Sequence, residues 1–292
     1  MRVVLFGATG FIGRALLPAL APEHEVVAVS RSPQPPQKGV TWVVADVTDT
    51  PAVRRALEGA DVVYYLVHSL GSPDFEERDV AGAQTTASEA ETAGVRQIVY
   101  LGGLGEEGEE LSPHLRSRLE TGRALASGAV PLTTLRAAVV VGKGSAAFET
   151  IVALVDRLPV MVAPRWVSTP TQPIALADAV QYLAAVAGRE ETIGESYDLG
   201  GPEVMTYRQM IERVAGIRGK QRVIIEVPVL TPFLSSLWLH LVTPVGASVA
   251  RPLIEGLRNP TVAEDTRIRD LVPFPLTPFD RAARKALGML GR

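Results

Sequence analysis

The chain has 292 residues, enough for one large domain or two small ones with a buried core, and its net charge is −3. Acidic and basic residues are mixed along it, so no basic surface for nucleic acid is predicted. The sequence contains no cysteine, which excludes disulfides, thiolate catalysis and cysteine metal sites. Its four histidines are scattered without a His-x-x-x-His pair, so no catalytic metal site is expected.

The N-terminal residues have strand character and run directly into a glycine-rich turn. A secretory signal would instead place charged residues ahead of a longer apolar stretch. We therefore expect a cytoplasmic protein.

The most informative pattern in the sequence lies in that N-terminal turn. An apolar run of strand length, 2–6, meets Gly7, Gly10 and Gly13 at G-x-x-G-x-x-G spacing, and an apolar helix pattern follows. Gly7 would allow the tight turn, Gly10 would leave room for a pyrophosphate, and Gly13 would let the helix pack closely on the sheet. The free N–H groups of such a helix N-terminus bind phosphate. The pattern predicts a dinucleotide site that also includes Thr9, Phe11 and Ile12.

Further strand and helix patterns alternate along the first half of the chain. Apolar strands are predicted at 25–30, 41–46, 61–67 and 97–101, with helices near 51–58 and 73–93. Ser72 is the expected N-cap of the second helix, and Pro73 its first residue. Continuous apolar strands separated by helices are typical of a parallel sheet covered on both faces. The predicted fold class is therefore α/β, a doubly wound Rossmann sheet with its ligand at the carboxyl ends of the strands.

The ends of these strands predict further cofactor contacts. The second strand ends in Ser30-Arg31 and lacks the carboxylate that usually holds the ribose of NAD. A hydroxyl and a guanidinium suit the 2′-phosphate of NADP, so NADPH is expected in preference to NADH. Asp46 and Val47 are expected beside the adenine, although Asp46 could instead cap the following turn. The end of the fourth strand is expected to flank the nicotinamide ribose with Leu66, Val67, His68 and Ser69.

Together these residues resemble an atypical member of the short-chain dehydrogenase/reductase superfamily. The likeness is carried by the glycine turn, by Asp46-Val47, by Val67-His68-Ser69 and by Tyr100-Leu101-Gly102-Gly103-Leu104. Within the superfamily the chain is most similar to the branch of NmrA-like redox sensors and the NADPH-binding accessory subunit of respiratory complex I. Segments 112–118, 158–161 and 172–174 resemble bacterial proteins often labelled nucleoside-diphosphate-sugar epimerases or NAD(P)-binding oxidoreductases. The resemblance implies NAD(P) binding, with Gly102 among the contacts.

The resemblance also locates the candidate catalytic residues. Most members place Ser or Thr after the fifth strand and Tyr-x-x-x-Lys at the start of the next helix, because residues four apart share a helix face. Here Gly102 and Gly103 follow the strand, and the next helix is predicted to start at Ser112-Pro113, an N-cap followed by a first-position proline. His114 and Arg118 occupy the Tyr and Lys positions of this helix. Two interpretations remain open. Either His114 is a proton donor or relay and Arg118 grips the ribose, or both are structural and hydride transfer is lost. The tyrosines of the fourth and fifth strands are expected in the core.

The second half predicts a smaller C-terminal α/β subdomain, residues 143–292, interleaved with the last elements of a Rossmann domain at 1–142. A sixth strand is predicted at 133–142, helices at 148–155, 206–216 and 279–290, and a short strand with a helix at 174–180. Asp178 is expected to stabilise a helix N-terminus rather than to act in catalysis. Arg165, Trp166 and Gln172 are candidates for a substrate pocket.

Residues 228–252 form an unusually apolar segment. It is interrupted by Pro232 and Pro244, so it is too short to span a bilayer. The alternatives are a buried helix or homo-oligomer interface, a substrate lid, and an interfacial membrane segment. The lack of lysine and arginine on a polar face disfavours membrane contact.

Three functions follow from these observations. The first is an NADP-dependent oxidoreductase acting on an apolar or carbonyl-bearing small-molecule substrate. The second is a non-catalytic NADPH-binding redox sensor or assembly factor with a regulatory protein partner. The third, sugar-nucleotide epimerisation, would need the Tyr-x-x-x-Lys base that the chain lacks.

Overall fold

A computed structural model describes residues 1–69, 74–105, 111–227 and 259–289. Its centre is a seven-stranded sheet in the order β3-β2-β1-β4-β5-β6-β11, in which every neighbouring pair runs parallel. The strands are β1 (Arg2–Phe6), β2 (Glu25–Ser30), β3 (Val40–Val44), β4 (Val62–Tyr65), β5 (Gln97–Gly103), β6 (Leu132–Ala137) and β11 (Ser196–Leu199). The α/β class and the doubly wound Rossmann sheet are thereby confirmed.

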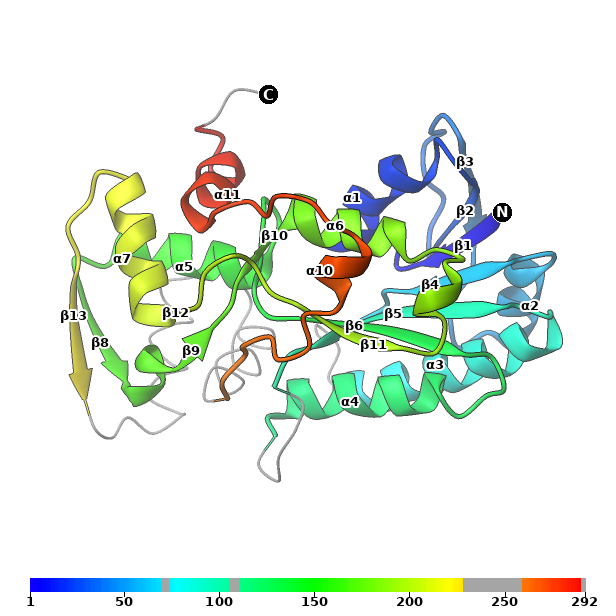
Figure 1. Ribbon diagram of the computed structural model, residues 1–292. Helices are drawn as coiled ribbons and strands as arrows, with labels where there is room; N and C mark the ends of the chain where they lie inside the picture. The colour runs from blue at the N-terminus through cyan, green and yellow to red at the C-terminus, as the bar shows by residue number, and fades with distance from the viewer. Residues whose placement is uncertain (70–73, 106–110, 228–258, 290–292) are drawn as a thin grey trace.

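Helices cover both faces of this sheet (Figure 1). On one face α1 (Phe11–Leu20) packs beside α6 (Leu176–Ala185), and on the other lie α2 (Thr50–Leu57), α3 (Phe75–Thr92) and α4 (Pro113–Leu125). Alternate residues of β1 serve the two cores: Val3 and Leu5 pack toward α1 and α6, Val4 and Phe6 toward the other three helices. Because both faces are buried, the strands are continuously apolar instead of alternating.

The tyrosines of β4 and β5 belong to these cores, as predicted. Tyr64, Tyr65 and Tyr100 are at most 1% exposed, and each hydroxyl donates to a backbone carbonyl. Burial raises the pKa of Tyr64 and of Tyr65. Because both side chains are fully buried and both hydroxyls donate to backbone carbonyls, neither can contact a substrate as the missing catalytic acid.

Several predicted elements differ from the structure in their bounds. The helix predicted from Pro73 begins at Phe75, after Asp74, and the predicted cap at Ser72 lies outside the described residues. The strand predicted at 133–142 divides, because β7 (Val140–Val141) leaves the main sheet to pair with β10 (Ile174–Ala175). The last helix, α11 (Phe279–Ala286), ends earlier than predicted. Segment 228–252 also lies outside the described residues.

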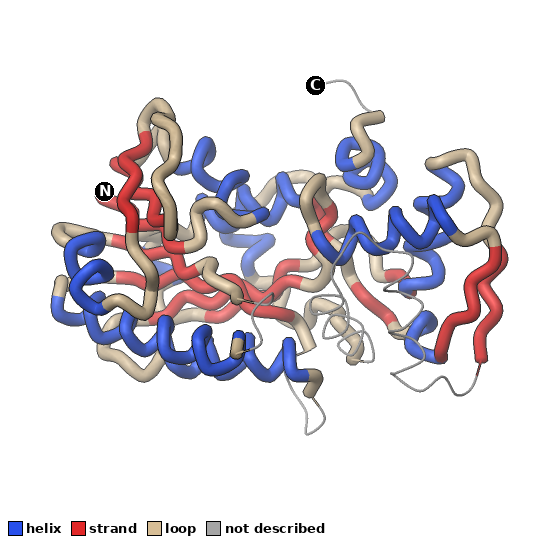
Figure 2. Tube along the Cα trace, turned by 180° about the vertical axis from the view of Figure 1, so that it is seen from behind, coloured by secondary structure: helices blue, strands red, loops and turns tan. Residues whose placement is uncertain are grey.

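A second lobe with its own apolar core follows β7. In it α5 (Ala146–Arg157), α7 (Tyr207–Ile217) and α11 pack together. The parallel ribbon of β8 (Val160–Pro164) and β13 (Val223–Val227) lies at the end of the molecule opposite the N-terminus (Figure 2). The short strands β9 (Pro170–Thr171) and β12 (Met205–Thr206) and the 3-10 turn Arg165–Ser168 complete this lobe. The helix α10 (Ile268–Leu271) and the 3-10 turn Glu190–Thr192 contact the central sheet instead. The domain boundary at residue 142 stays a prediction.

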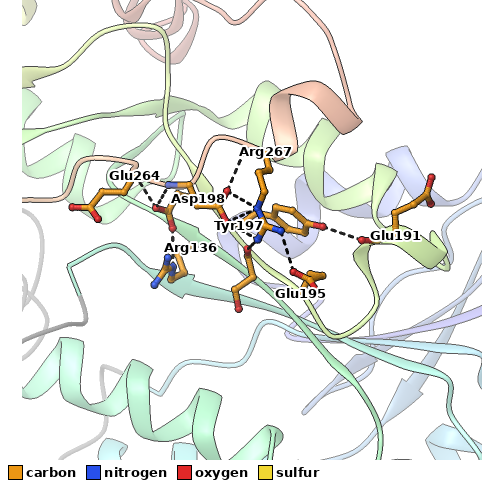
Figure 3. A network of polar contacts seen from close by, with 9 residues as sticks. Arg136, Glu191, Glu195, Tyr197, Asp198, Glu264 and Arg267 are labelled. Carbon is orange, nitrogen blue, oxygen red and sulfur yellow. Dashed lines mark hydrogen bonds and ion pairs between the residues drawn. The ribbon is translucent and has the colours of Figure 1, made fainter.

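The segment from 259 onward returns to the central sheet and is fastened there by Asp198 of β11. The Asp198 carboxylate accepts the backbone N–H groups of Glu264 and Asp265 at 2.9 and 3.0 Å, and Arg136 Nε donates to it at 2.7 Å (Figure 3). Asp198 is 3% exposed. This buried carboxylate therefore joins both halves of the chain through backbone and side-chain hydrogen bonds.

The remaining polar residues singled out in the second half have structural contacts. Asp178 lies in the first turn of α6, as expected, and its carboxylate accepts two hydrogen bonds from Thr277, at 2.6 and 2.8 Å. The Gln172 amide donates to Gly201 O at 2.7 Å and accepts from the backbone N–H of Ala263 at 3.0 Å. The Trp166 ring packs edge-on against an aromatic ring of α7, 6.3 Å between centroids. These contacts explain Gln172 and Trp166 without a substrate.

Candidate functional site

Gly7, in the turn from β1 to α1, and Gly13, in the first turn of α1, are glycines because of contacts within the protein. Gly7 has a φ of +81°, and a Cβ on it would lie 2.5 Å from the carbonyl oxygen of Leu66. A Cβ on Gly13 would collide with the carbonyl oxygen of Gly7 and lie 2.8 Å from Ala8 Cα. The turn conformation and the close helix–sheet approach predicted from sequence are thus both present.

Gly10 has a different environment. A Cβ on it would have one neighbour within 4 Å, the carbonyl oxygen of Gly7 at 3.1 Å. Gly10 is the N-cap of α1, makes no side-chain cap, and lines an open cavity. The first N–H groups of α1 need partners from outside the helix, and a phosphate provides them. A ligand therefore explains this glycine better than the fold does.

The cavity lined by Gly10 has a volume of about 210 Å³ and lies at the carboxyl ends of β1, β2, β3 and β4. The strand order reverses between β1 and β4, which is where doubly wound sheets bind their ligands. The lining brings together most of the residues predicted to contact the cofactor: Gly7, Thr9, Gly10, Ser30, Arg31, Asp46, Val47, Leu66, Val67, His68 and Ser69. The other four predicted contacts lie in α1 and β5, outside this lining: Phe11, Ile12, Gly13 and Gly102. Cofactor contact by any of these residues stays a prediction.

Two guanidinium groups and one carboxylate surround one part of the cavity. Arg31 follows β2, and Arg78 comes from α3. Asp46 Oδ1 accepts the backbone N–H and the hydroxyl of Thr48 at 3.0 and 2.8 Å, and Arg78 Nη2 lies 3.5 Å from Oδ2. The Thr48 hydrogen bonds and the charges of Arg78 and Arg31 together lower the pKa of Asp46. Asp46 thus both caps its turn and lines the cavity, while the Ser30 hydroxyl donates to a backbone carbonyl at 2.5 Å.

A chain of polar side chains leads from this cavity to α4. Asp79 of α3 is 1% exposed, and its Oδ2 lies 2.7 Å from Nδ1 of His68. Its Oδ1 accepts the backbone N–H of Ser69 at 2.9 Å, and the Ser117 hydroxyl lies 3.5 Å from Oδ2. On the other side of the ring, His68 Nε2 lies 3.1 Å from Nδ1 of His114. His68 therefore links the predicted cofactor cavity to the predicted catalytic residue.

Both histidines have lowered pKa values. Burial, aided by the charge of Arg118, lowers the pKa of His68, although its hydrogen bond to Asp79 acts in the opposite direction. Burial, followed by the neighbouring His68 and Arg118, lowers the pKa of His114 to about 3. Both rings are therefore neutral near pH 7. His114 in this state is a neutral imidazole with one donor and one acceptor nitrogen, and its role as a proton donor or relay stays a prediction.

Arg118 lies one turn after His114 on α4, as the spacing predicts. Its guanidinium carbon is 4.7 Å from the centroid of the Tyr100 ring, and the Tyr100 hydroxyl donates to the Arg118 carbonyl oxygen at 2.8 Å. This cation–π contact gives Arg118 a structural role. Its contact with a ribose stays a prediction.

Three polar residues of the site were not predicted from the sequence: Thr48, Arg78 and Asp79. In a doubly wound sheet, the helix after each strand begins at the carboxyl edge. Polar residues in the first turns of α3 were therefore a usable signal for Arg78. For Asp79 the sequence carries no sign of its burial or of its pairing with His68, because both depend on packing between α3, α4 and the loop after β4.

Residues 7–136 match the sequence model of a family described as NAD(P)H-binding. The chain carries an NAD(P)H-binding domain. The matched region contains the glycine turn, Asp79, His114 and, apart from Phe6, every residue that lines the cavity.

Relatives of this NAD(P)H-binding domain include a reductase and a complex I subunit. The chain is 27% identical over 229 residues to the (4-alkanoyl-5-oxo-2,5-dihydrofuran-3-yl)methyl phosphate reductase of Streptomyces griseus, covering 75% of this chain and 74% of that protein. It is 25% identical over 223 residues to NADH dehydrogenase [ubiquinone] 1 alpha subcomplex subunit 9 of Arabidopsis thaliana, covering 71% of this chain but 56% of the subunit. These homologues lie in the NmrA-like, complex I subunit and reductase branch of the short-chain dehydrogenase/reductase superfamily, as the sequence resemblance indicated.

The fold is also found in solved structures. The triphenylmethane reductase of Citrobacter sp., solved in complex with NADP(H), superposes with a TM-score of 0.76 at 18% identity, covering 98% of this chain and 100% of that one.

Two other kinds of feature are absent from the part of the chain that the structure describes. No described helix has the length and apolar character needed to cross a membrane, and no three described metal-ligating side chains gather at one place.

Proposed function

We propose that this protein binds NADP(H) in preference to NAD(H) and is an oxidoreductase that acts on a small molecule, with His114 exchanging a proton with the substrate. The proposal is carried by the cavity at the ends of β1 to β4, whose lining joins the N-terminus of α1 to Arg31 and Arg78. The helix N-terminus suits a pyrophosphate. The bound nicotinamide would supply the hydride chemistry.

The preference for NADP(H) rests on charge. An NAD site places a carboxylate at the end of the second strand, to hold the ribose hydroxyls. Arg31 occupies that position here, and Arg78 adds a second guanidinium, whereas the single carboxylate, Asp46, is engaged by Thr48. Guanidinium groups offer the paired donors that a 2′-phosphate accepts. The NADP(H) in the triphenylmethane reductase of the same fold is consistent with this preference.

A non-catalytic NADPH-binding sensor or accessory factor is a second candidate. Arg118 stays charged and stacks on Tyr100, so it cannot move a proton as a lysine does. Gly102, near the end of β5, provides no hydroxyl. The similarity to a complex I subunit supports the same candidate, which would act on a regulatory protein partner. It predicts NADPH binding without turnover.

Calorimetric titration with NADPH and with NADH tests the cofactor. We expect NADPH to bind at least about tenfold more tightly, a difference of about 1.4 kcal/mol. Arg31→Ala should weaken NADPH binding about tenfold and leave NADH binding nearly unchanged. Arg55→Ala is the matched control, because it removes the same charge from an exposed position of α2. Equal affinity for both nucleotides would contradict the preference, and no binding of either would contradict the site.

Turnover is tested by following the absorbance of the reduced nicotinamide in panels of carbonyl compounds with NADPH and of alcohols with NADP⁺. The oxidoreductase predicts activity that His114→Ala abolishes while NADPH still binds. Tight NADPH binding without turnover in either panel would favour the sensor or accessory factor.

A further inference from the structure

We propose that Asp79 and His68 are positioning residues that hold His114 as a proton acceptor while Asp79 is ionised, so that the substrate group it meets in this state is a hydroxyl. The substrate class rests on the proposed function. The positions of the protons on Asp79, His68 and His114 do not depend on the proposed function, and they can be measured in the protein without a substrate.

The direction of the hydrogen bonds follows from Asp79. A carboxylate can only accept, so Nδ1 of His68, 2.7 Å away, carries a proton. In a neutral imidazole the other nitrogen then has only a lone pair, and His68 Nε2 is an acceptor. His114 Nδ1, 3.1 Å from it, must therefore donate. This leaves the lone pair of His114 on Nε2, the nitrogen at the end of the chain.

This direction requires both rings to be neutral. The charged or titratable groups acting on them come from two helices, Asp79 of α3 and Arg118 of α4, and from each ring on the other. Burial and Arg118 oppose a positive charge on either ring, and Asp79 favours one. The balance lowers the pKa of His68 and of His114, so near pH 7 neither becomes a cation. The donor and acceptor of each hydrogen bond between Asp79, His68 and His114 therefore stay as assigned.

The resulting step balances as oxidation of a secondary alcohol with NADP⁺ as the hydride acceptor. The carbinol C–H bond breaks to give the hydride, and the O–H proton passes to His114 Nε2. The Nδ1 proton of His114 moves to His68 Nε2, and the Nδ1 proton of His68 moves to Asp79 Oδ2. The products are a carbonyl compound, NADPH and a protonated Asp79, which returns its proton to water between turnovers. The reverse step, carbonyl reduction by NADPH, starts from protonated Asp79 and runs the same proton movements backwards.

Nitrogen NMR of the imidazole rings in the ¹⁵N-labelled full chain tests the proposal. The sequence has four histidines, so His68→Gln and His114→Gln suffice to assign the two rings. Near pH 7 we expect a protonated Nδ1 and an unprotonated Nε2 in both, with a coupling across the hydrogen bond from His114 Nδ1 to His68 Nε2. A proton on Nε2 of His114 would overturn the proposal and the hydroxyl substrate with it.

Asp79→Asn gives the sharper test. The Ser69 N–H donates to Oδ1, so the Asn carbonyl should take that place and turn its NH₂ toward His68. That NH₂ donates to His68 Nδ1 and forces the proton to Nε2, a change of tautomer known from Asp→Asn replacements beside histidine. His114 must follow, and the nitrogen signals of both rings should exchange. If the nitrogen signals of His68 exchange and those of His114 do not, the two rings are not coupled through their hydrogen bond and the proposal is wrong.

Ser117→Ala is the matched control. It removes a hydroxyl 3.5 Å from the same Asp79 oxygen, but Ser117 takes no part in the hydrogen bonds that join Asp79, His68 and His114. The tautomers of His68 and His114 should therefore stay as in the native protein. If Asp79→Asn fails to fold, the nitrogen NMR spectrum of the native protein still tests the proposal, because it reports the tautomers of His68 and His114. Nucleotide binding is measured separately. Tight NADPH binding with the opposite tautomers overturns the relay alone, and the expected tautomers without nucleotide binding overturn the proposed function alone.

Discussion

At the scale of single residues, the glycine turn separates what the fold needs from what a ligand needs. A Cβ on Gly7 meets a backbone oxygen at 2.5 Å in a left-handed conformation, whereas one on Gly10 meets its single neighbour at 3.1 Å. Gly7→Ala should lower the free energy of unfolding by about 2 kcal/mol or more. Gly10→Ala should cost less than about 1 kcal/mol in stability yet weaken NADPH binding at least about tenfold. Urea unfolding and calorimetry measure the two effects, and equal loss of stability in both variants would contradict the assignment.

His114 gives the protein a defined acid sensitivity. Its pKa is about 3 when folded and near the ordinary 6.5 when unfolded. As the pH falls between these values, the unfolded chain takes up a proton that the folded protein refuses, so stability falls by up to about 1.4 kcal/mol per pH unit. Above the ordinary pKa the His114 ring is neutral in both states, so it does not change the free energy of unfolding with pH. Urea unfolding across the range should show a shallower acid slope for His114→Gln, and equal slopes would show that His114 is not buried as a neutral ring.

At the scale of elements, α7 has one well-formed end and one weak position. Thr206 and Gln209 form a capping box at its start, while Gly216 is exposed near its end, where an added Cβ would have no neighbour within 4 Å. Thr206→Ala should destabilise the protein by about 1 kcal/mol. Gly216→Ala should stabilise it by about 0.5–1 kcal/mol. NADPH affinity should change in neither, because the cavity is built from other elements. Thermal unfolding checks the signs, and the same sign for both would contradict this account.

At the scale of the whole molecule, Asp198 joins the two halves of the chain. Asp198→Ala would leave two backbone N–H groups without this acceptor and remove the buried carboxylate from Arg136, so we expect a loss of about 3 kcal/mol. Asp265→Ala is the control, since its partner Arg267 is 60% exposed and the pair should contribute less than about 1 kcal/mol. Denaturant unfolding distinguishes them. A similar loss in both would mean that Asp198 does not hold the halves together.

The sequence by itself determined the features that depend on neighbours along the chain. The glycine turn, the parallel strands and the Ser112 cap of α4 all follow local rules, because a backbone conformation or a helix start needs only a few consecutive residues. Tertiary structure alone decided the rest. The contact between His68 and His114 joins residues 46 positions apart, and Asp79 became a buried partner only when α3 packed beside α4. The residues of the glycine turn could therefore be predicted from the sequence, whereas the nitrogen of His114 that carries the proton could not.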